Sequence, residues 1–217
     1  TVPKKNIRKI LGKPLIAYTI EQAKQSNTLT RVIVSTEADE IMRVAKSFDC
    51  EVPFKRPMEL ATDDVPVLPY VVRHAIKVLK ERENYTPDIV VVLQPTCPLR
   101  KANEIDEAVN KLIRTGADMV VSLCEVKNHP LRMWKLDGDK VSPFVRSDAI
   151  YAQRQDFPKL YRITGSIYAF WTKTIFKDNF FEGDVRGIIF DELSSIDIDT
   201  ELDLLFVEFI LTKMHKA

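Results

Sequence analysis

The run Asp-Ile-Val-Val-Val-Leu-Gln at residues 88–94 constrains the fold more than any other stretch of the sequence. A continuous β-branched, apolar run of this kind is typical of a strand that is buried on both faces of a sheet. Such strands occur in parallel sheets that helices cover on both sides. The run therefore predicts an α/β fold.

Apolar strand patterns alternate with amphipathic helical patterns along the rest of the chain. Further strands are predicted at residues 31–36, 118–126, 165–170 and 194–199, and helices at about 14–26, 37–48 and 102–115. This βαβα order predicts a doubly wound, mostly parallel sheet, in which ligands bind beyond the carboxyl ends of the strands. Residues 128–163 break the pattern with turns, aromatic residues and basic residues, and they are predicted to form an arm or insertion.

The bulk composition excludes several classes of protein. The chain has 217 residues, which suit one domain, and a net charge of +1, which gives no electrostatic reason for nucleic-acid binding. Its three cysteines are far apart and form no Cys-x-x-Cys pair, so a reducing, cytoplasmic compartment is expected rather than disulfides or a zinc site. No apolar run reaches the roughly 18 residues that a membrane-spanning helix needs, so no membrane span is expected.

The segment Ser-Ser-Ile-Asp-Ile-Asp-Thr-Glu-Leu-Asp, residues 194–203, forms an acidic corner. In an extended segment the two isoleucines share one face, and Asp197 and Asp199 share the other. Thr200 is predicted to cap a following helix whose first turn is acidic. Two readings stay open from these residues alone, namely a solvated loop with a good helix cap and a divalent metal site, because hard cations prefer carboxylate oxygens.

Several other residues could bind an anionic ligand, although each also fits an ordinary surface or loop position. Lys5 lies in a basic cluster near the start, Pro57 holds Arg56 extended, and Gln94 follows the strongest strand. The predicted arm adds three guanidinium groups that suit carboxylate or phosphate, on Arg132, Arg154 and Arg162. With no glycine-rich phosphate loop of the usual kinds, the residues indicate a metal-assisted reaction on a phosphorylated, acidic substrate.

Together these motifs resemble those of the acylneuraminate cytidylyltransferases. The matching stretches run in order along the chain: PKKNIRKILGKPLIAYTI, RVIVSTE, RPMELATDD, LQPTCPLR, RQDFPKLYRITGSIY and SIDIDTELDL. The resemblance implies a Rossmann-like nucleotidyltransferase that uses CTP and Mg²⁺. In that family the anomeric hydroxyl of a nonulosonic acid, an acidic nine-carbon keto sugar, attacks the α-phosphate of CTP, and pyrophosphate leaves.

The resemblance also assigns roles to particular residues. It implies that Asp197, Asp199 and Lys5 are catalytic, with Mg²⁺ held by the two aspartates. It implies nucleotide-binding roles for Lys5, Asn6, Arg56 and Asp63. It implies sugar contacts from Gln94, Arg132, Arg154, Arg162, Tyr168, Phe180 and Phe181. For the three aromatic residues, core packing is the alternative. The family's arm crosses to a second subunit, so a homodimer with a shared site is expected.

Three departures from the family pattern carry expectations of their own. The family begins with a strand and a phosphate-cradling loop directly before the stretch that matches PKKN, so both are expected upstream of residue 1. Val67 stands where a nucleotide-contacting hydroxyl residue is expected. Thr164 stands where the family has asparagine, which suggests tuning toward another nonulosonic acid such as legionaminate or pseudaminate.

Three alternative functions remain open at the level of the sequence. An aspartyl-phosphate phosphatase uses an Asp-x-Asp motif after a strand, but Thr200 sits one position early for that motif, which also lies near the wrong end of the chain. A nucleotide-sugar glycosyltransferase uses a similar motif, usually in the middle of the chain. A non-catalytic nucleotide-binding or dimerisation module is the third alternative.

Overall fold

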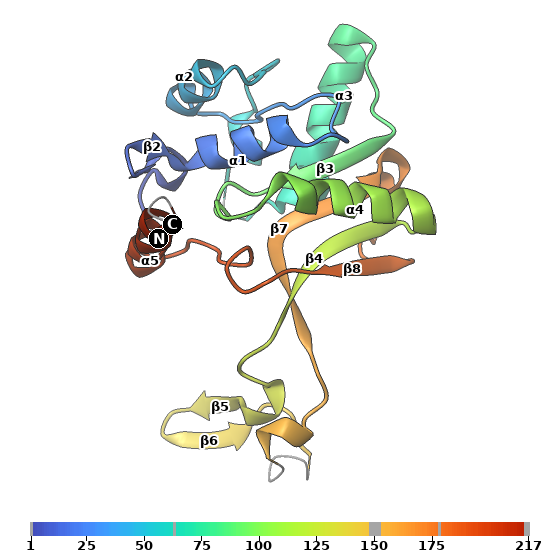
Figure 1. Ribbon diagram of the computed structural model, residues 1–217. Helices are drawn as coiled ribbons and strands as arrows, with labels where there is room; N and C mark the ends of the chain where they lie inside the picture. The colour runs from blue at the N-terminus through green and yellow to red at the C-terminus, as the bar shows by residue number, and fades with distance from the viewer. Residues whose placement is uncertain (1, 63, 148–152, 178, 215–217) are drawn as a thin grey trace.

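The computed structural model describes residues 2–62, 64–147, 153–177 and 179–214, and it consists of a body and an arm that extends away from it (Figure 1). The helices of the body are α1 (Leu15–Gln25), α2 (Asp39–Ser47), α3 (Val72–Glu83), α4 (Ala102–Thr115) and α5 (Glu201–Met214). The helices predicted at about 14–26, 37–48 and 102–115 are confirmed as α1, α2 and α4. Among the described helices, none is both long and apolar enough to cross a bilayer.

The central sheet has the order β3–β7–β4–β8, with β3 (Ile89–Leu93), β4 (Met119–Glu125), β7 (Tyr161–Trp171) and β8 (Val185–Ile189). β7 pairs antiparallel with both β3 and β4, whereas β4 and β8 are parallel. Three of the four strands therefore run the same way. β7 is reversed because it leads the chain back from the arm into the sheet. The α/β class is confirmed, and the reversed strand makes the sheet mixed.

Helices cover both faces of this sheet because the side chains of its strands alternate between them. Val120 of β4 and Ala169 of β7 pack in one cluster with the apolar stripe of α4. Their neighbours Val121 and Phe170 point the other way and pack with α3. This alternation is the two-residue period expected of strands with both faces buried.

Two predicted strands are wrong in the described residues. Segment 31–36 makes only isolated bridges, from Ile33 to Glu51 and from Thr36 to Lys55. Segment 194–199 begins in a turn at residues 194–195 and joins no sheet, although Ile198 N donates to the carbonyl of Thr96 in a loop at 2.9 Å. A strand needs a ladder as well as an apolar pattern, and neither segment has a continuous partner.

A cavity of about 1100 Å³ lies between β3 and segment 31–36. Val91 and Leu93 line it from one side, Val32 and Val34 from the other, and α1 and α3 contribute further apolar side chains. Because β3 pairs only with β7 among the described strands, its second edge is open and its residues are half-buried. The prediction that the strand of residues 88–94 is buried on both faces is therefore wrong for the residues that the structure describes.

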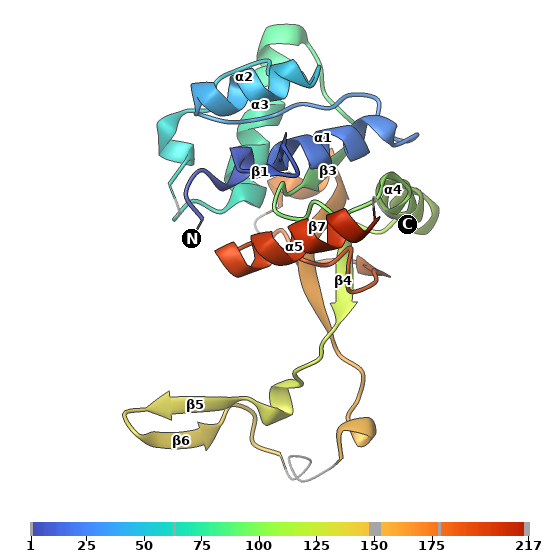
Figure 2. The same cartoon turned by 60° about the vertical axis from the view of Figure 1, so that its left-hand side comes forward.

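The arm consists of the residues between β4 and β7, and it carries a small hairpin of β5 (Trp134–Asp137) and β6 (Lys140–Pro143). Figures 1 and 2 show the hairpin well separated from the body in both views. Leu136 and Val141 are cross-strand partners, and both are more than half exposed, as are Trp134 and Phe144. The hairpin thus presents apolar side chains without covering them.

Asp106 of α4 fixes the loop that leads from α1 into segment 31–36. Its carboxylate accepts hydrogen bonds from Ser26 Oγ at 2.5 Å, Thr28 Oγ1 at 2.8 Å and the backbone N–H of Thr28 at 3.1 Å. Asn27 donates from its backbone and its side chain. Burial opposes ionisation of Asp106, but these hydrogen bonds outweigh it and lower the pKa to about 2.

We expect Asp106→Asn to lower the free energy of unfolding by about 1–2 kcal/mol at pH 7, because the ionised acceptor is lost. The folded-state pKa is depressed, so this stabilisation is present above the unfolded pKa of about 4 and is lost as the pH falls toward 2. Urea unfolding at several pH values measures it, with the exposed neighbour Glu107→Gln as the matched control. A difference between wild type and Asp106→Asn that is as large at pH 2 as at pH 7 would contradict the assignment.

Candidate functional site

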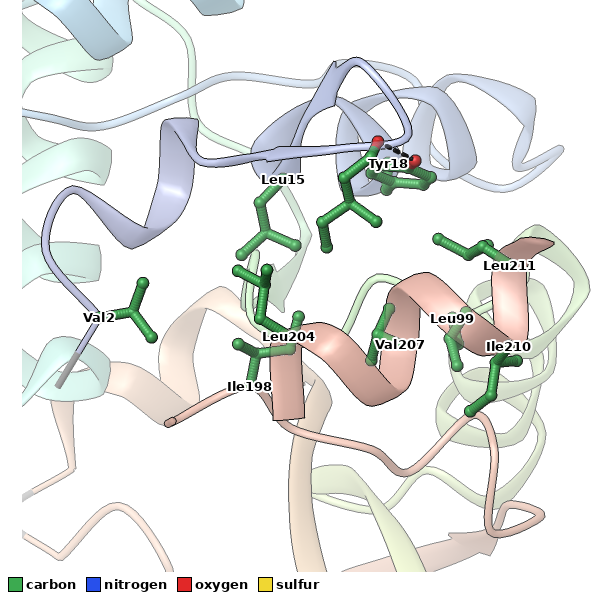
Figure 3. Packing of buried hydrophobic residues seen from close by; sticks show 10 residues of the cluster. Val2, Leu15, Tyr18, Leu99, Ile198, Leu204, Val207, Ile210 and Leu211 are labelled. Carbon is green, nitrogen blue, oxygen red and sulfur yellow. Dashed lines mark hydrogen bonds between the residues drawn. The ribbon is translucent and has the colours of Figure 1, made fainter. Parts of the chain in front are cut away.

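The acidic corner meets the first residues of the chain. Lys5 Nζ donates to Asp199 Oδ1 at 3.0 Å and to the carbonyl of Ile198 at 2.7 Å. Ile198 is fully buried in a cluster that includes Leu15 of α1 and Leu204 of α5 (Figure 3). This anchor leaves the two aspartates on the opposite side, as the alternation predicts. The structure therefore brings together two predicted catalytic residues that are 194 positions apart.

Asp197 lies against the loop that follows β3. Its Oδ1 is 3.9 Å from the Sγ of Cys97, and the backbone of its neighbour Ile198 bonds to Thr96. Burial raises the pKa of the Cys97 thiol to about 11, and the negative charge of Asp197 adds to this, so the thiol stays protonated. Loop 94–100 and the acidic corner are thus in direct contact.

The predicted helix cap after the acidic corner is confirmed, and the carboxylate of Asp203 forms part of it. Thr200 Oγ1 accepts a hydrogen bond from Asp203 N at 3.2 Å, and Asp203 Oδ2 accepts from Thr200 N at 2.8 Å. The hydrogen bond from the Thr200 hydroxyl and those from the backbone of Thr200 and Asp199 lower the pKa of Asp203. Because Asp203 serves the cap, Asp197 and Asp199 are the carboxylates of this corner that remain for a ligand.

The donor set of this corner suits a cation that arrives with a polyphosphate. Among the described residues, no group of three or more His, Cys, Asp or Glu side chains is arranged to hold a metal ion. Mg²⁺ is usually bound by one or two carboxylates together with waters and substrate phosphates, rather than by a protein cage. Asp197 and Asp199 fit that requirement.

Gln94 lies at the end of β3 against an irregularity in β7. The register passes from Val121–Tyr168 to Leu123–Ile163, so β7 has extra residues opposite Ser122. Gly165 in this bulge has φ +77°, and a Cβ there would lie 3.1 Å from Gln94 Oε1. The carboxamide of Gln94 therefore packs directly on the backbone of Gly165.

Thr164 belongs to the core. Its side chain is buried, and its hydroxyl lies 2.6 Å from the hydroxyl of Ser122. A second hydrogen bond, from Ser166 N, ends on the same oxygen at 3.3 Å. The side chain thus stabilises the bulge of β7, and this position gives no support to the interpretation that Thr164 selects the sugar by direct contact.

Two predicted nucleotide-binding residues line the same cavity as Gln94, namely Asn6 and Arg56. Arg56 forms an ion pair with Glu37, and its Nε is buried with no hydrogen-bond partner among the described residues. Val67 also lines this cavity. Asp63, the other predicted nucleotide-binding residue, lies outside the described residues.

The arginines predicted from the arm are not all brought to the site. Arg162 Nη2 donates to the carbonyl of Ser195 at 3.1 Å, which places it beside the acidic corner. Arg132 lies in the short helical turn Pro130–Arg132 that precedes the hairpin, with its guanidinium 5.2 Å from the ring centre of Phe157. Arg154 begins a short helical turn in the arm, and its side chain is not among those described.

The predicted aromatic wall divides into core and surface residues. Tyr168 and Phe180 are buried and pack in the cluster that lies between the sheet and α3. Burial raises the pKa of Tyr168, and the negative charge of Asp197 contributes in the same direction. Phe181 is half exposed and contacts Phe180 edge-on at 5.4 Å. For Tyr168 and Phe180 the structure matches the core alternative.

Arg100 is not among the residues predicted from the sequence, and its side chain is buried next to the backbone of Gln94. Its two terminal nitrogens donate to the carbonyl of Gln94, both at 3.3 Å. Its position in the LQPTCPLR stretch was the available signal, but an arginine after a proline-containing turn is usually exposed.

Comparison with known proteins gives a consistent result. A sequence model of the family described as cytidylyltransferase matches residues 1–194. The chain is 34% identical to the CMP-N,N'-diacetyllegionaminic acid synthase of Legionella pneumophila, over 100% of this chain and 93% of that protein. It is 32% identical to the N-acylneuraminate cytidylyltransferase of Escherichia coli, over 98% of this chain and 49% of that protein.

Solved structures support the same fold at low sequence identity. A CMP:2-keto-3-deoxy-manno-octonic acid synthetase complexed with CTP superposes with a TM-score of 0.69 and 15% identity, covering 98% of this chain and 93% of that one. The 4-diphosphocytidyl-2C-methyl-D-erythritol synthase of Anaerococcus prevotii gives 0.67 and 14%, covering 95% and 93%. The predicted nucleotidyltransferase fold is therefore confirmed.

We expect Gly165→Ala to lower the free energy of unfolding more than Gly116→Ala, by about 1 kcal/mol or more. Both glycines have positive φ, but a Cβ at position 116 meets nothing within 4 Å, whereas one at position 165 meets the Gln94 carboxamide. Urea denaturation of both variants separates the shared backbone strain from the contact. Equal losses would mean that the contact with Gln94 does not contribute.

Proposed function

The chain belongs to the cytidylyltransferase family, and we propose that it transfers CMP from CTP to a nonulosonic acid of the N-acylneuraminate type, with release of pyrophosphate. The observation that carries the proposal is the corner in which Asp199 pairs with Lys5 while Asp197 adjoins the loop of Gln94. The contacts of this corner support the proposal because two carboxylates and the Lys5 ammonium adjoin the loop that begins with the Gln94 carboxamide. The family match favours this reaction over the phosphatase and glycosyltransferase alternatives.

The identity of the sugar is the finer part of the proposal. A legionaminate derivative is the second candidate, because a relative named for it is 34% identical along the whole chain. The pseudaminic acid cytidylyltransferase of Campylobacter jejuni is 29% identical. These two sequence identities are too close to each other to distinguish the acyl groups of the sugar. The sugar must therefore be assigned by measuring the turnover of each candidate.

In the proposed mechanism, Asp197 and Asp199 would hold Mg²⁺, which when bound neutralises phosphate charge and acidifies a coordinated hydroxyl. Lys5 brings a point charge to the same corner, where a departing pyrophosphate would need it. Asn6 and Arg56, from the cavity wall, bind the nucleotide. Gln94 and Arg162 bind and orient the acidic sugar, which keeps its hydroxyl near the α-phosphate.

We further propose that an extended strand and a phosphate loop that precede residue 1 complete this site. The cavity beside β3 supports this, because two segments with open edges face each other across it and its walls are apolar. An added strand would pair with β3 and give segment 31–36 the ladder that it lacks. The loop after that strand would reach the polar end of the cavity, near Asn6 and Gln94.

The arm supports a homodimer, in which Arg132 and Arg154 would reach the site of the partner. Three buried free cysteines, at positions 50, 97 and 124, and a CTP substrate support a cytoplasmic location.

The first test is pyrophosphate release with CTP and Mg²⁺, with N-acetylneuraminate, legionaminate and pseudaminate offered separately. We expect release with one sugar, and a loss of about 100-fold or more in Asp197→Ala and in Asp199→Ala, because each removes a ligand of the proposed Mg²⁺. Glu201→Gln is the matched control, since Glu201 is an exposed neighbour that pairs with Arg8.

The assay compares this chain with a product that also carries its upstream residues. Release by the longer product alone would support the strand and loop. Full activity in both aspartate variants would overturn the metal assignment, and CTP binding without turnover of any of the sugars would favour the non-catalytic module.

We expect the double variant Leu136→Gln/Val141→Gln to weaken dimerisation by about tenfold or more, because it removes an exposed cross-strand apolar pair. Sedimentation velocity over a range of concentrations measures the dissociation constant, and Lys140→Gln in the same hairpin is the control. A wild-type chain that stays monomeric at high concentration would exclude the dimer.

A further inference from the structure

Arg100 is the largest fully buried side chain of the described residues. It lies where loop 94–100 leads into α4, and its guanidinium contacts three different parts of the body. The terminal nitrogens donate to the carbonyl of Gln94, to the carbonyl of Ser166 in β7 at 2.6 Å and to Thr19 Oγ1 in α1 at 2.8 Å. One guanidinium thus ties the loop to the sheet and to a helix.

The acceptors of this guanidinium are all neutral. No carboxylate of the described residues lies within ion-pair distance of Arg100, and its Nε is buried without a hydrogen-bond partner. Burial lowers the pKa of Arg100 to about 10, which still leaves it protonated at neutral pH. The carboxylate of the buried Glu104 acts on Arg100 electrostatically but forms no direct ion pair with it. A buried cation without a direct partner is costly, and an apolar residue of similar length is often tolerated better. Stability alone therefore gives a poor account of an arginine here.

The hydrogen bonds of the Arg100 guanidinium link the two backbones that meet at the Gln94–Gly165 contact. Gln94 Oε1 packs on Gly165, and Arg100 holds the carbonyls of both adjoining backbones, those of Gln94 and Ser166. A planar guanidinium fork can hold several acceptors in fixed directions, which the single ammonium of lysine cannot do. The Thr164–Ser122 pair holds the bulge of β7 itself. Arg100 links the backbone of Gln94 to that bulge, so the placement of the Gln94 carboxamide against it depends on this guanidinium.

We propose that Arg100 is a positioning residue that aims the Gln94 carboxamide at the sugar substrate by holding both sides of the Gln94–Gly165 contact. The inference rests on the sugar-binding role proposed above for Gln94. Arg100 itself touches neither substrate, since it lies behind the loop. Its loss changes the affinity for the sugar and leaves the nucleotide side, around Arg56, unaffected.

The test compares Arg100→Lys, Arg100→Met and Gln94→Ala by KM for the sugar and for CTP, in the longest active product. We expect each variant to raise the KM of the sugar by about tenfold, with the KM of CTP within about twofold of wild type. In the Gln94→Ala background, Arg100→Lys should add less than about twofold, because both changes disable the same contact. Thr19→Val is the matched control: it removes a bond to Arg100 on the α1 side, and its sugar KM should stay within about twofold.

A second readout is independent of activity. The side-chain amide of Gln94 should give one protected NMR resonance pair in wild type and in Thr19→Val, and a broadened or unprotected pair in Arg100→Met. If neither Arg100 variant folds, Ser166→Ala removes a hydroxyl acceptor of the guanidinium, and it should raise the KM of the sugar by about threefold.

An unchanged KM of the sugar in folded Arg100→Lys, or in Ser166→Ala, would overturn the proposal. Additive effects of Arg100→Lys and Gln94→Ala on that KM would also overturn it, as would an unperturbed Gln94 amide resonance in Arg100→Met. If Gln94→Ala leaves the sugar KM unchanged while Arg100→Lys raises it, positioning through Gln94 is likewise overturned. Absence of turnover in wild type would count against the proposed function alone, and the amide resonances would then decide on Arg100.

Discussion

The site depends on the buried bulge of β7 opposite Ser122. Its extra residues are held by hydroxyl groups, with Thr164 and Ser122 at 2.6 Å and Ile167 N bonded to Ser122 Oγ at 2.9 Å. Buried polar groups in a sheet need hydrogen-bond partners, so these hydrogen bonds hold the strand in one conformation at the bulge. The bulge opens the space that the Gln94 carboxamide occupies, and β7 runs from the arm into the sheet through it.

The acidic corner shows how a chain can prepare carboxylates for a ligand without burying charge. Ile198 takes the core position, so its neighbours are turned outward, and Lys5 partly neutralises Asp199 from the other end of the chain. The side chain of Asp199 is 74% exposed, and ion pairs of this kind contribute little stability. A cation and a phosphate could therefore replace the pair at small cost, which fits the proposal that this corner binds and releases polyphosphate.

Local patterns predicted those parts of the molecule whose partners are near in sequence or repeat regularly. The run 88–94 predicted the strand β3, and the cap at Thr200 followed from Asp203 three residues later. Family resemblance assigned both Lys5 and Asp199 to one site, but their ion pair was not predicted, because no local rule joins residues so far apart. Segment 31–36 failed as a strand because its pattern fits a ladder whose partner is not among the described strands.

Burial was the property that the sequence could not assign. Tyr168 and Phe180 carry the same signal whether they line a pocket or fill a core, and the structure places them in the core. Arg100 is the reverse case, since arginine is rarely buried unless paired and its bonds reach α1 and β7 across 81 and 66 positions.

The composition of β3 does not match its surroundings in the structure. Its residues are those of a strand buried on both faces, yet it is exposed to a cavity along one edge. The apolar side chains that line this cavity favour a further chain segment that would cover them, because each methylene group buried from water stabilises the fold by about 0.8 kcal/mol. The composition of β3 thus fits a sheet that continues past it, and Asn6, Arg56 and Gln94 lie around the same opening. The strand proposed above to extend the sheet would therefore also shape the proposed site, and stability and substrate binding would be coupled at this edge.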